Sequence, residues 1–200
     1  MTPEQLQQSL AKLAGLDARL AAVEGDRGVR NVLARYMKLC DQPCCDQAFP
    51  QLADLFTEEA VWEGVGAQYS QTFGRRSGRA AIAAFLGGYL APASSHFKMN
   101  AHFLSSDQVA VDGARARGEW TMLQASTYQD DSCELIAARL NINFMQQDQV
   151  WQISHFRTER LFCVPWNQQV ANLFGAVNSA NAAANSPFKT ATSAVLQGEE

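Results

Sequence analysis

Acid–base chemistry in this chain depends on a small set of side chains. His102 lies in the stretch AHFLSS, and Asp41 follows a helical stretch that stops before Pro43. A neutral imidazole, whose unperturbed pKa is about 6.5, can act as a general base near neutral pH. A carboxylate that accepts a hydrogen bond from one ring nitrogen fixes the tautomer and leaves the other nitrogen free. The structural alternatives are a solvated helix end for Asp41 and a buried sheet histidine for His102. His96 is expected to be an ordinary loop residue.

Polar residues alternate with apolar ones in the stretch LNINF. Asn141 and Asn143 alternate with Leu140, Ile142 and Phe144. Because successive side chains of a strand point to opposite faces, the two asparagines share a face. They are expected either to form the polar wall of a pocket or to face solvent.

Aromatic side chains are the second ingredient of a ligand site. Most are expected in the core. Some should line a pocket, which is typical of a mostly apolar, ring-containing ligand that a few polar groups hold in place. The candidates are Trp62, Trp120, Trp151, Phe103, Phe144 and Tyr128.

Other kinds of site lack their motifs. The chain contains no Gly-x-Ser-x-Gly elbow, which argues against a hydrolase nucleophile. The stretch GRRSGR is not followed by Lys-Ser/Thr, so it does not indicate a phosphate-binding loop. The five cysteines include no Cys-x-x-Cys and no second Cys/His pair with zinc spacing. We therefore expect neither metal nor cofactor, and reduced thiols in a cytoplasmic protein.

Composition places the chain among ordinary globular proteins. It has 200 residues, of which 47% are hydrophobic and 18% charged, as expected for one domain with extensions. The net charge of -4 gives no indication of a basic nucleic-acid-binding face. No apolar run approaches the roughly 18 residues of a membrane span, and the N-terminus lacks the basic region of a signal peptide. Nucleic acid and membrane are therefore not expected as partners.

The first half of the chain is expected to be helical. Residues 2–24 have the periodicity of an amphipathic helix, and Thr2 and Gln5 can form a capping box. The glycine-containing stretch 25–28 is predicted to break this helix. A second helix then carries Tyr36 and ends near Asp41, before a proline.

The next segment is expected to mix short elements. A short helix is predicted over about 47–56, and a strand begins near Ala60. The Gly-, Gln- and Ser-rich stretch 64–76 is predicted to be a loop. Ser77 is a candidate cap for a helix that extends to Tyr89.

Residues 96–163 are expected to form strands. Asp112-Gly113 is the strongest hairpin signal, and a second reversal is predicted at 147–149. The alternation of the last strand predicts one shared face for Trp151, Ile153, His155 and Arg157. Helices followed by an antiparallel meander predict an α+β fold, with helices packed on one face of a curved antiparallel sheet.

Five segments in this order resemble the SnoaL-like branch of the nuclear-transport-factor-2-like superfamily. They are VLARYMKLCDQ, LADLFTEEAVWEG, GRRSGRAAIAAFL, AHFLSSDQVAVDGARARGEW and AARLNINFMQQDQVWQISHFR. The resemblance implies a cone, in which the bent sheet wraps around the helices and leaves a pocket at the wide end. The resemblance covers roughly residues 25–160 and predicts a SnoaL-like domain over 25–166. Periodicity and composition predict an N-terminal amphipathic helix over 1–24 and a low-complexity tail over 167–200, both outside the resemblance.

The resemblance also implies roles for individual residues. In dehydratase-like relatives, an Asp at the end of a Tyr-x-x-x-x-Asp helix orients a His on the sheet, and Asp41 and His102 match these positions. Tyr36 matches the tyrosine, whose phenol can hydrogen-bond a substrate carbonyl or a leaving group. Relatives often carry an Arg near Arg157, which could clamp a carbonyl or an anionic leaving group, and His155 is an equal candidate.

The function that follows is a cofactor-independent, dehydratase-like lyase or isomerase. His102 would remove a proton from a small, largely apolar, ring-containing substrate. One alternative is a ligand-binding or structural subunit, such as the small subunit of an oxygenase. Another is an epoxide hydrolase, which needs a second carboxylate opposite Asp41, with Glu63, Asp107 and Glu119 as candidates. Relatives usually form dimers or trimers, so a homodimer or homotrimer is expected.

Overall fold

The computed structural model describes residues 2–41, 48–90 and 97–165. Its helices are α1 (Pro3–Cys40), α2 (Ala48–Ala53), α3 (Gly66–Thr72) and α4 (Arg79–Leu90). Its strands are β1 (Phe56–Val65), β2 (Arg75–Ser77), β3 (Phe97–Asp112), β4 (Arg115–Tyr128), β5 (Cys133–Gln147) and β6 (Val150–Pro165). His96 and the predicted tail over 167–200 lie outside the described residues.

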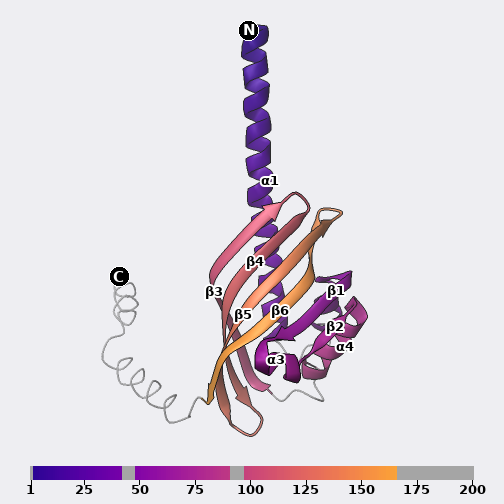
Figure 1. The fold of residues 1–200 in the computed structure, drawn as a ribbon, viewed down its shortest axis with the longest axis vertical. Coiled ribbons are helices and arrows are strands. Elements are labelled where there is room, and N and C mark those ends of the chain that lie inside the picture. The colour runs from indigo at the N-terminus through magenta and orange to yellow at the C-terminus, as the bar shows by residue number, and fades with distance from the viewer. Residues whose placement is uncertain (1, 42–47, 91–96, 166–200) are drawn as a thin grey trace, which may run out of the picture.

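The fold is α+β, as predicted. One six-stranded sheet has the order β2-β1-β6-β5-β4-β3, and it curves around the second half of α1 (Figure 1). The sheet is mixed rather than purely antiparallel, because β1 and β6 run parallel. A parallel pair needs a long connection, and here α3, β2, α4 and three further strands separate the two partners along the chain.

Helix α1 is one continuous helix of 38 residues, so the predicted break at 25–28 is wrong. The glycines there serve close packing. A methyl group at Gly28 would lie 2.5 Å from Cδ1 of Trp151, and one at Gly25 would lie 2.8 Å from a methyl carbon of Val111. The predicted capping box at Thr2 and Gln5 is present.

The stretch 64–76 is not a simple loop. It contains α3 and the start of β2, which pairs with β1 from Glu63 to Val61. Burial explains the difference, because Tyr69 of α3 is buried and its ring lies 4.6 Å from that of Phe73. Ser77 belongs to β2, and α4 begins at Arg79.

Both predicted hairpin turns are confirmed. The chain reverses at Gly113 between β3 and β4, and at Asp148 and Gln149 between β5 and β6. Asp148 and Gln149 both have positive φ, as the commonest two-residue hairpin turn requires. A third reversal, between β4 and β5, was not predicted.

Strand β6 contains a bulge that changes which residues share a face. Asn143 pairs with His155 and Phe144 pairs with Ile153, which leaves Ser154 as an extra residue. The predicted common face of Trp151, Ile153, His155 and Arg157 is therefore wrong. Trp151 and Ile153 are buried in the core, while His155 and Arg157 lie on the outer face, turned away from α1.

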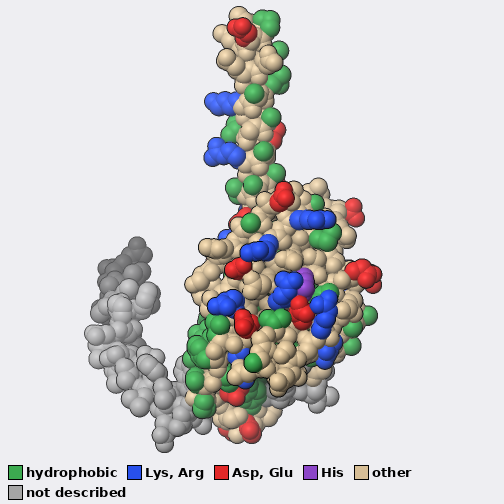
Figure 2. Space-filling view, in the orientation of Figure 1, with side chains coloured by type: hydrophobic (Ala, Val, Ile, Leu, Met, Phe, Trp, Pro, Cys, Tyr) green, Lys and Arg blue, Asp and Glu red, His purple; other side chains and the backbone are tan. Residues whose placement is uncertain are grey.

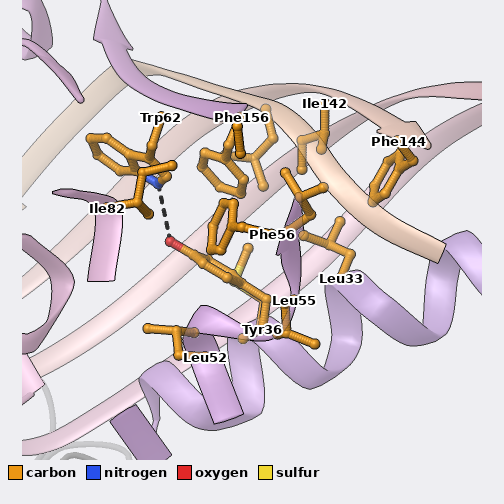
Figure 3. Packing of buried hydrophobic residues seen from close by; sticks show 14 of the residues in the cluster. Leu33, Tyr36, Leu52, Leu55, Phe56, Trp62, Ile82, Ile142, Phe144 and Phe156 are labelled. Carbon is orange, nitrogen blue, oxygen red and sulfur yellow. Dashed lines mark hydrogen bonds between the residues drawn. The ribbon is translucent and has the colours of Figure 1, made fainter. Parts of the chain in front are cut away.

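The core lies between α1 and the inner face of the sheet (Figure 3). Trp62 of β1 stacks on Phe156 of β6, with 5.8 Å between ring centroids. The indole N–H of Trp62 donates a hydrogen bond to the hydroxyl oxygen of Tyr36 on α1, at 3.2 Å. This packing fixes α1 against the sheet and so determines where Asp41, at the end of the helix, lies.

The contact of Gly28 with Trp151 predicts a specific loss of stability. Gly28→Ala should lower the free energy of unfolding by about 1–3 kcal/mol, because the new methyl group overpacks the helix–sheet contact. Gly15→Ala is the matched control, since a methyl group there meets nothing within 4 Å. Urea unfolding followed by tryptophan fluorescence measures both, and an equal response of the two variants would contradict the packing role.

Candidate active site

The end of α1 meets β3 through one carboxylate. Asp41 follows the last helical residue, and its backbone N–H donates to the carbonyl of Met37 at 2.9 Å. One carboxylate oxygen of Asp41 lies 2.6 Å from Nδ1 of His102, and the other accepts from the backbone N–H of His102 at 3.2 Å. The ring and the backbone of His102 are therefore both held by Asp41.

This contact determines how His102 can act. Because a carboxylate accepts at Nδ1, that nitrogen carries the proton, and Nε2 keeps its lone pair. The side chain of His102 is only 10% exposed. No hydrogen bond joins Nε2 to any residue that the structure describes. In its neutral form, the imidazole is thus an oriented base whose Nε2 has no hydrogen-bond partner among the described residues.

His102 lines a pocket of about 320 Å³ between α3, α4 and the strands. Its apolar lining is largely aromatic and consists of Trp62, Tyr69, Phe73, Phe85, Leu86, Phe97 and Ile136. Its polar lining consists of Cys40, Thr72, Asn100, His102, Gln124, Tyr128, Glu134 and Arg160. Asp41 does not line this pocket but, together with His102, borders a second hollow between α1 and β3. His102 thus borders both hollows, whereas Asp41 borders only the second.

A network of amides supports the base. Oδ1 of Asn100 accepts from the side-chain amide of Gln124 and from the hydroxyl of Ser126, both at 2.8 Å. Nδ2 of Asn100 donates to the carbonyl oxygen of Cys40 at 3.3 Å. Asn100 therefore ties the end of α1 to β3 beside the Asp41–His102 contact. Gln124 lies directly across from His102 in β4.

A second polar group lines the pocket at the ends of β4, β5 and β6. The hydroxyl of Tyr128 donates to Glu134 at 2.6 Å. Burial and the adjacent Glu134 carboxylate raise the pKa of Tyr128, so the phenol stays protonated. The guanidinium of Arg160 lies over the ring of Tyr69, 5.5 Å from its centroid. These groups offer charged and hydrogen-bonding contacts to a ligand.

Cys40 lines the pocket but is not a nucleophile. Burial, together with the adjacent Asp41, raises the pKa of its thiol to about 12. The thiolate is the reactive form of cysteine, and at neutral pH it is almost absent here. Cys40 therefore contributes shape and polarizable surface.

The structure brings some predicted pocket residues to the pocket and not others. Trp62 and Tyr128 line it. Tyr36 lies beneath it in the core, where burial raises its pKa well above the ordinary value, and it contacts Trp62. Phe103 is 57% exposed and does not line the pocket. The remaining aromatic candidates are buried in the core: Trp120, Trp151 and Phe144.

His155 and Arg157 lie on the outer face of the sheet, where they contact Glu63. Nε2 of His155 is 2.7 Å from the Glu63 carboxylate, and Nε of Arg157 donates to the same oxygen at 3.2 Å. Arg157 also donates to Nδ1 of His155 at 2.9 Å. The pairing register places Asn141 and Asn143 beside them. Figure 2 shows this face, on which a histidine lies among basic and acidic side chains.

The carboxylates considered for an epoxide hydrolase do not meet Asp41. Glu63 lies in the outer-face cluster. Asp107 pairs with Arg30, and Glu119 pairs with Arg117. None of the three lines the pocket that His102 borders.

Several pocket residues were not found from the sequence. Asn100 shares the alternation of His102 on β3, and that pattern could have indicated it. Gln124 could not be found in this way, because β3 contains a bulge between Ser105 and Gln108. Glu134 and Arg160 have no local motif, and only the tertiary fold brings them to the pocket.

The comparisons agree with this architecture. A curved sheet that wraps a long helix and leaves a pocket beside it is the nuclear-transport-factor-2-like fold. A family model described as the SnoaL-like domain matches residues 21–157. The chain belongs to this family of SnoaL-like domains. The matched region leaves out most of the first half of α1. No curated protein matches the chain.

Solved structures share the fold at low sequence identity. A nuclear-transport-factor-2-like protein with a cystatin-like fold from Novosphingobium aromaticivorans is 25% identical, with a TM-score of 0.61 over 74% of this chain and 90% of that one. A protein designated a scytalone dehydratase from the same organism is 15% identical, with a TM-score of 0.59 over 72% and 88%. A type 2 hexachlorocyclohexane dehydrochlorinase is 17% identical, with a TM-score of 0.59 over 78% and 93%.

The part of the chain that the structure describes contains neither a candidate membrane span nor a group of metal ligands. No helix in this part of the chain is long and apolar enough to span a membrane. Within the same residues, no three His, Cys, Asp or Glu side chains are grouped as metal ligands.

The outer-face cluster predicts a pH-dependent contribution to stability. Burial opposes the charge of Glu63, but its bonds with His155 and Arg75 outweigh burial and lower its pKa. A lowered pKa stabilises the fold at neutral pH, and this contribution is lost as the pH falls through the folded-state value. Glu63→Gln should therefore lower the free energy of unfolding by about 1–3 kcal/mol at pH 7, and the gap to the unmodified protein should narrow in acid.

Glu119→Gln is the matched control for Glu63→Gln. Glu119 also contacts an arginine, at 2.8 Å, but both side chains are well exposed. Such surface pairs contribute about 0–1 kcal/mol. Urea unfolding at several pH values measures the two variants. A gap between Glu63→Gln and the unmodified protein that stays constant down to acid pH would exclude the carboxylate as its source.

Proposed function

We propose that this protein is a cofactor-independent, dehydratase-like lyase in which His102 removes a proton from carbon. The observation that carries the proposal is the 2.6 Å contact between Asp41 and Nδ1 of His102. This histidine lines an aromatic pocket, and its other ring nitrogen has no hydrogen-bond partner among the described residues. An isomerase would begin with the same proton transfer. Two of the solved neighbours are named for eliminations, a dehydration and a dehydrochlorination.

The chemistry of each group follows from its position. Nε2 of His102 takes the proton, and the electron pair of the broken C–H bond forms a double bond as the leaving group departs with its own bonding pair. Asp41 stabilises the imidazolium that results. If the leaving group is a hydroxyl, the imidazolium can return the proton to it, so that water leaves. These contacts are strong because the aromatic lining excludes water.

The pocket lining supports a small, largely apolar, ring-containing substrate. Aromatic side chains form most of its walls, and polar groups lie at a few places. Of these, Arg160 could hold a carbonyl or an anionic leaving group, whereas the side-chain amide of Gln124 already donates to Asn100 and Ser126. Tyr36 would act indirectly, by holding Trp62 in the pocket wall. Arg157, His155, Asn141, Asn143 and Phe103 have no part in this proposal, because none of them lines the pocket.

Substitution of the pair tests the proposal. The probes are a panel of cyclic β-hydroxyketones and chlorinated cyclohexanes, and mass spectrometry follows the loss of water or hydrogen chloride. His102→Ala and Asp41→Asn should each lower turnover by at least about 100-fold. Asp107→Asn is the matched control for Asp41→Asn, and it should leave turnover within about twofold, since Asp107 lies on the surface and pairs with Arg30.

Two outcomes would contradict the proposal. Turnover that survives His102→Ala would exclude this histidine as the base. Quenching of tryptophan fluorescence by panel compounds without any turnover would instead favour the ligand-binding alternative, since Trp62 lines the pocket. Circular dichroism of each variant shows whether a loss of turnover reflects a loss of fold.

A further inference from the structure

The first half of α1 projects from the rest of the molecule (Figures 1 and 2). Its apolar side chains form a leucine stripe, and each is 45–66% exposed: Leu6, Leu10, Leu13, Leu16, Leu20 and Val23. A continuous apolar stripe on a helix without tertiary contacts is unusual for a monomeric protein. An isolated helix in water is also only marginally stable. The stripe therefore calls for a partner surface.

The stripe follows a heptad repeat. Leu6, Leu13 and Leu20 fall at position a. Ser9, Leu16 and Val23 fall at position d, and Leu10 falls at the flanking position e. Positions a and d together form the apolar seam of the helix. A repeat that placed Leu10 in this seam would also place Asp17 and Glu24 there. The apolar repeat of seven is the pattern that two helices need to pack knobs into holes.

The charges beside the seam indicate which helix can bind there and in which orientation. Position g carries Lys12 and Arg19, and position e carries Asp17 and Glu24. In a parallel coiled coil, a residue at g lies near the residue five positions later at e of the other helix. Lys12 would then meet Asp17 of the partner subunit, and Arg19 would meet Glu24 of the partner subunit. An antiparallel pair would place like charges together. The sequence of this helix is thus complementary to itself in parallel register.

The globular domain leaves the seam accessible. At the base of the projecting segment, Gly25 and Gly28 face the domain, where they contact Val111 and Trp151. Gly25 and Gly28 fall at f and b of the repeat, opposite a and d. The next a position after Leu20 is Arg27, so the apolar seam ends where the helix enters the domain.

From these observations we propose that the leucine stripe binds the same stripe of a second copy of the chain, as a parallel, in-register coiled coil. The part of this contact up to Leu20 lies outside the region that the SnoaL-like family model matches from residue 21 onward. It is independent of the chemistry proposed for the pocket.

A disulfide between seam positions tests the register. Ser9 would lie opposite Ser9 of the partner subunit, so the full-length Ser9→Cys variant should form a dimer linked by a disulfide under mild oxidation. The unmodified chain is the control for the native cysteines. In an antiparallel pair Ser9 would lie near the other end of the seam, and no such link would form.

Charge placed in the seam tests the surface. In the Ser9→Cys background, Leu13→Glu with Leu20→Glu should reduce cross-linking at least about tenfold. The matched control, Ala11→Glu with Ala18→Glu, puts the same charges at f and should leave cross-linking within about twofold. Sedimentation equilibrium should show a mass of two or more chains for the control and a lower mass for the seam variant.

The outcomes separate the possible occupants. Failure of Ser9→Cys to cross-link would overturn the proposal, as would equal losses in the seam and control variants. Absence of the link together with binding to vesicles of phosphatidylserine and phosphatidylcholine would assign the stripe to a lipid surface instead. Thermal unfolding checks that each variant retains its globular domain.

Discussion

The contact of Asp41 with His102 links the fold to the chemistry of the pocket. It joins the end of α1 to β3, an edge strand of the sheet, and it uses both carboxylate oxygens of Asp41. Because one oxygen binds the backbone and the other binds the ring, the position of β3 and the tautomer of the imidazole are set by the same side chain. Asn100 adds a second link at the same place, through the carbonyl of Cys40. These hydrogen bonds together hold the end of α1 against β3.

The pocket that His102 lines has an aromatic part and a polar part. Aromatic side chains from α3, α4 and β1 form its walls, while amide and charged groups lie on the strands. The buried Cys40 thiol stays protonated, so it does not act as a base beside His102. Such a division suits a ligand that is mostly hydrocarbon, with a hydrogen-bonding group held near the base.

Local sequence signals predicted the elements better than their registers. The Asp112-Gly113 turn and the Thr2–Gln5 capping box follow from interactions within a few residues, and both are present. Gly25 and Gly28 look like a helix break in the sequence. In the structure they instead allow close contacts of α1 with Val111 and Trp151 on distant strands. Nothing in the local sequence distinguishes these two uses of glycine.

The β-bulges limit how much of the candidate site can be predicted from the sequence. If β3 and β4 were paired without a bulge from Asp112–Arg115 onward, His102 would lie opposite Ala125 rather than Gln124. Every pair beyond the bulge, away from the turn, would then join side chains of opposite faces. In β6, the extra residue Ser154 moves His155 and Arg157 to the outer face. The Asp41–His102 pair escaped this error because the family resemblance aligned it directly, independently of strand register.

The continuity of α1 has a mechanical consequence. The helix has 38 residues, which at 1.5 Å per residue is about 57 Å. It contains no proline after the first turn and no hinge, so it behaves as a stiff rod with the exposed leucines near one end and the catalytic carboxylate candidate at the other. A partner bound to the projecting end of α1 would therefore also fix the orientation of its other end. Asp41 and the imidazole of His102 that it contacts lie at that other end.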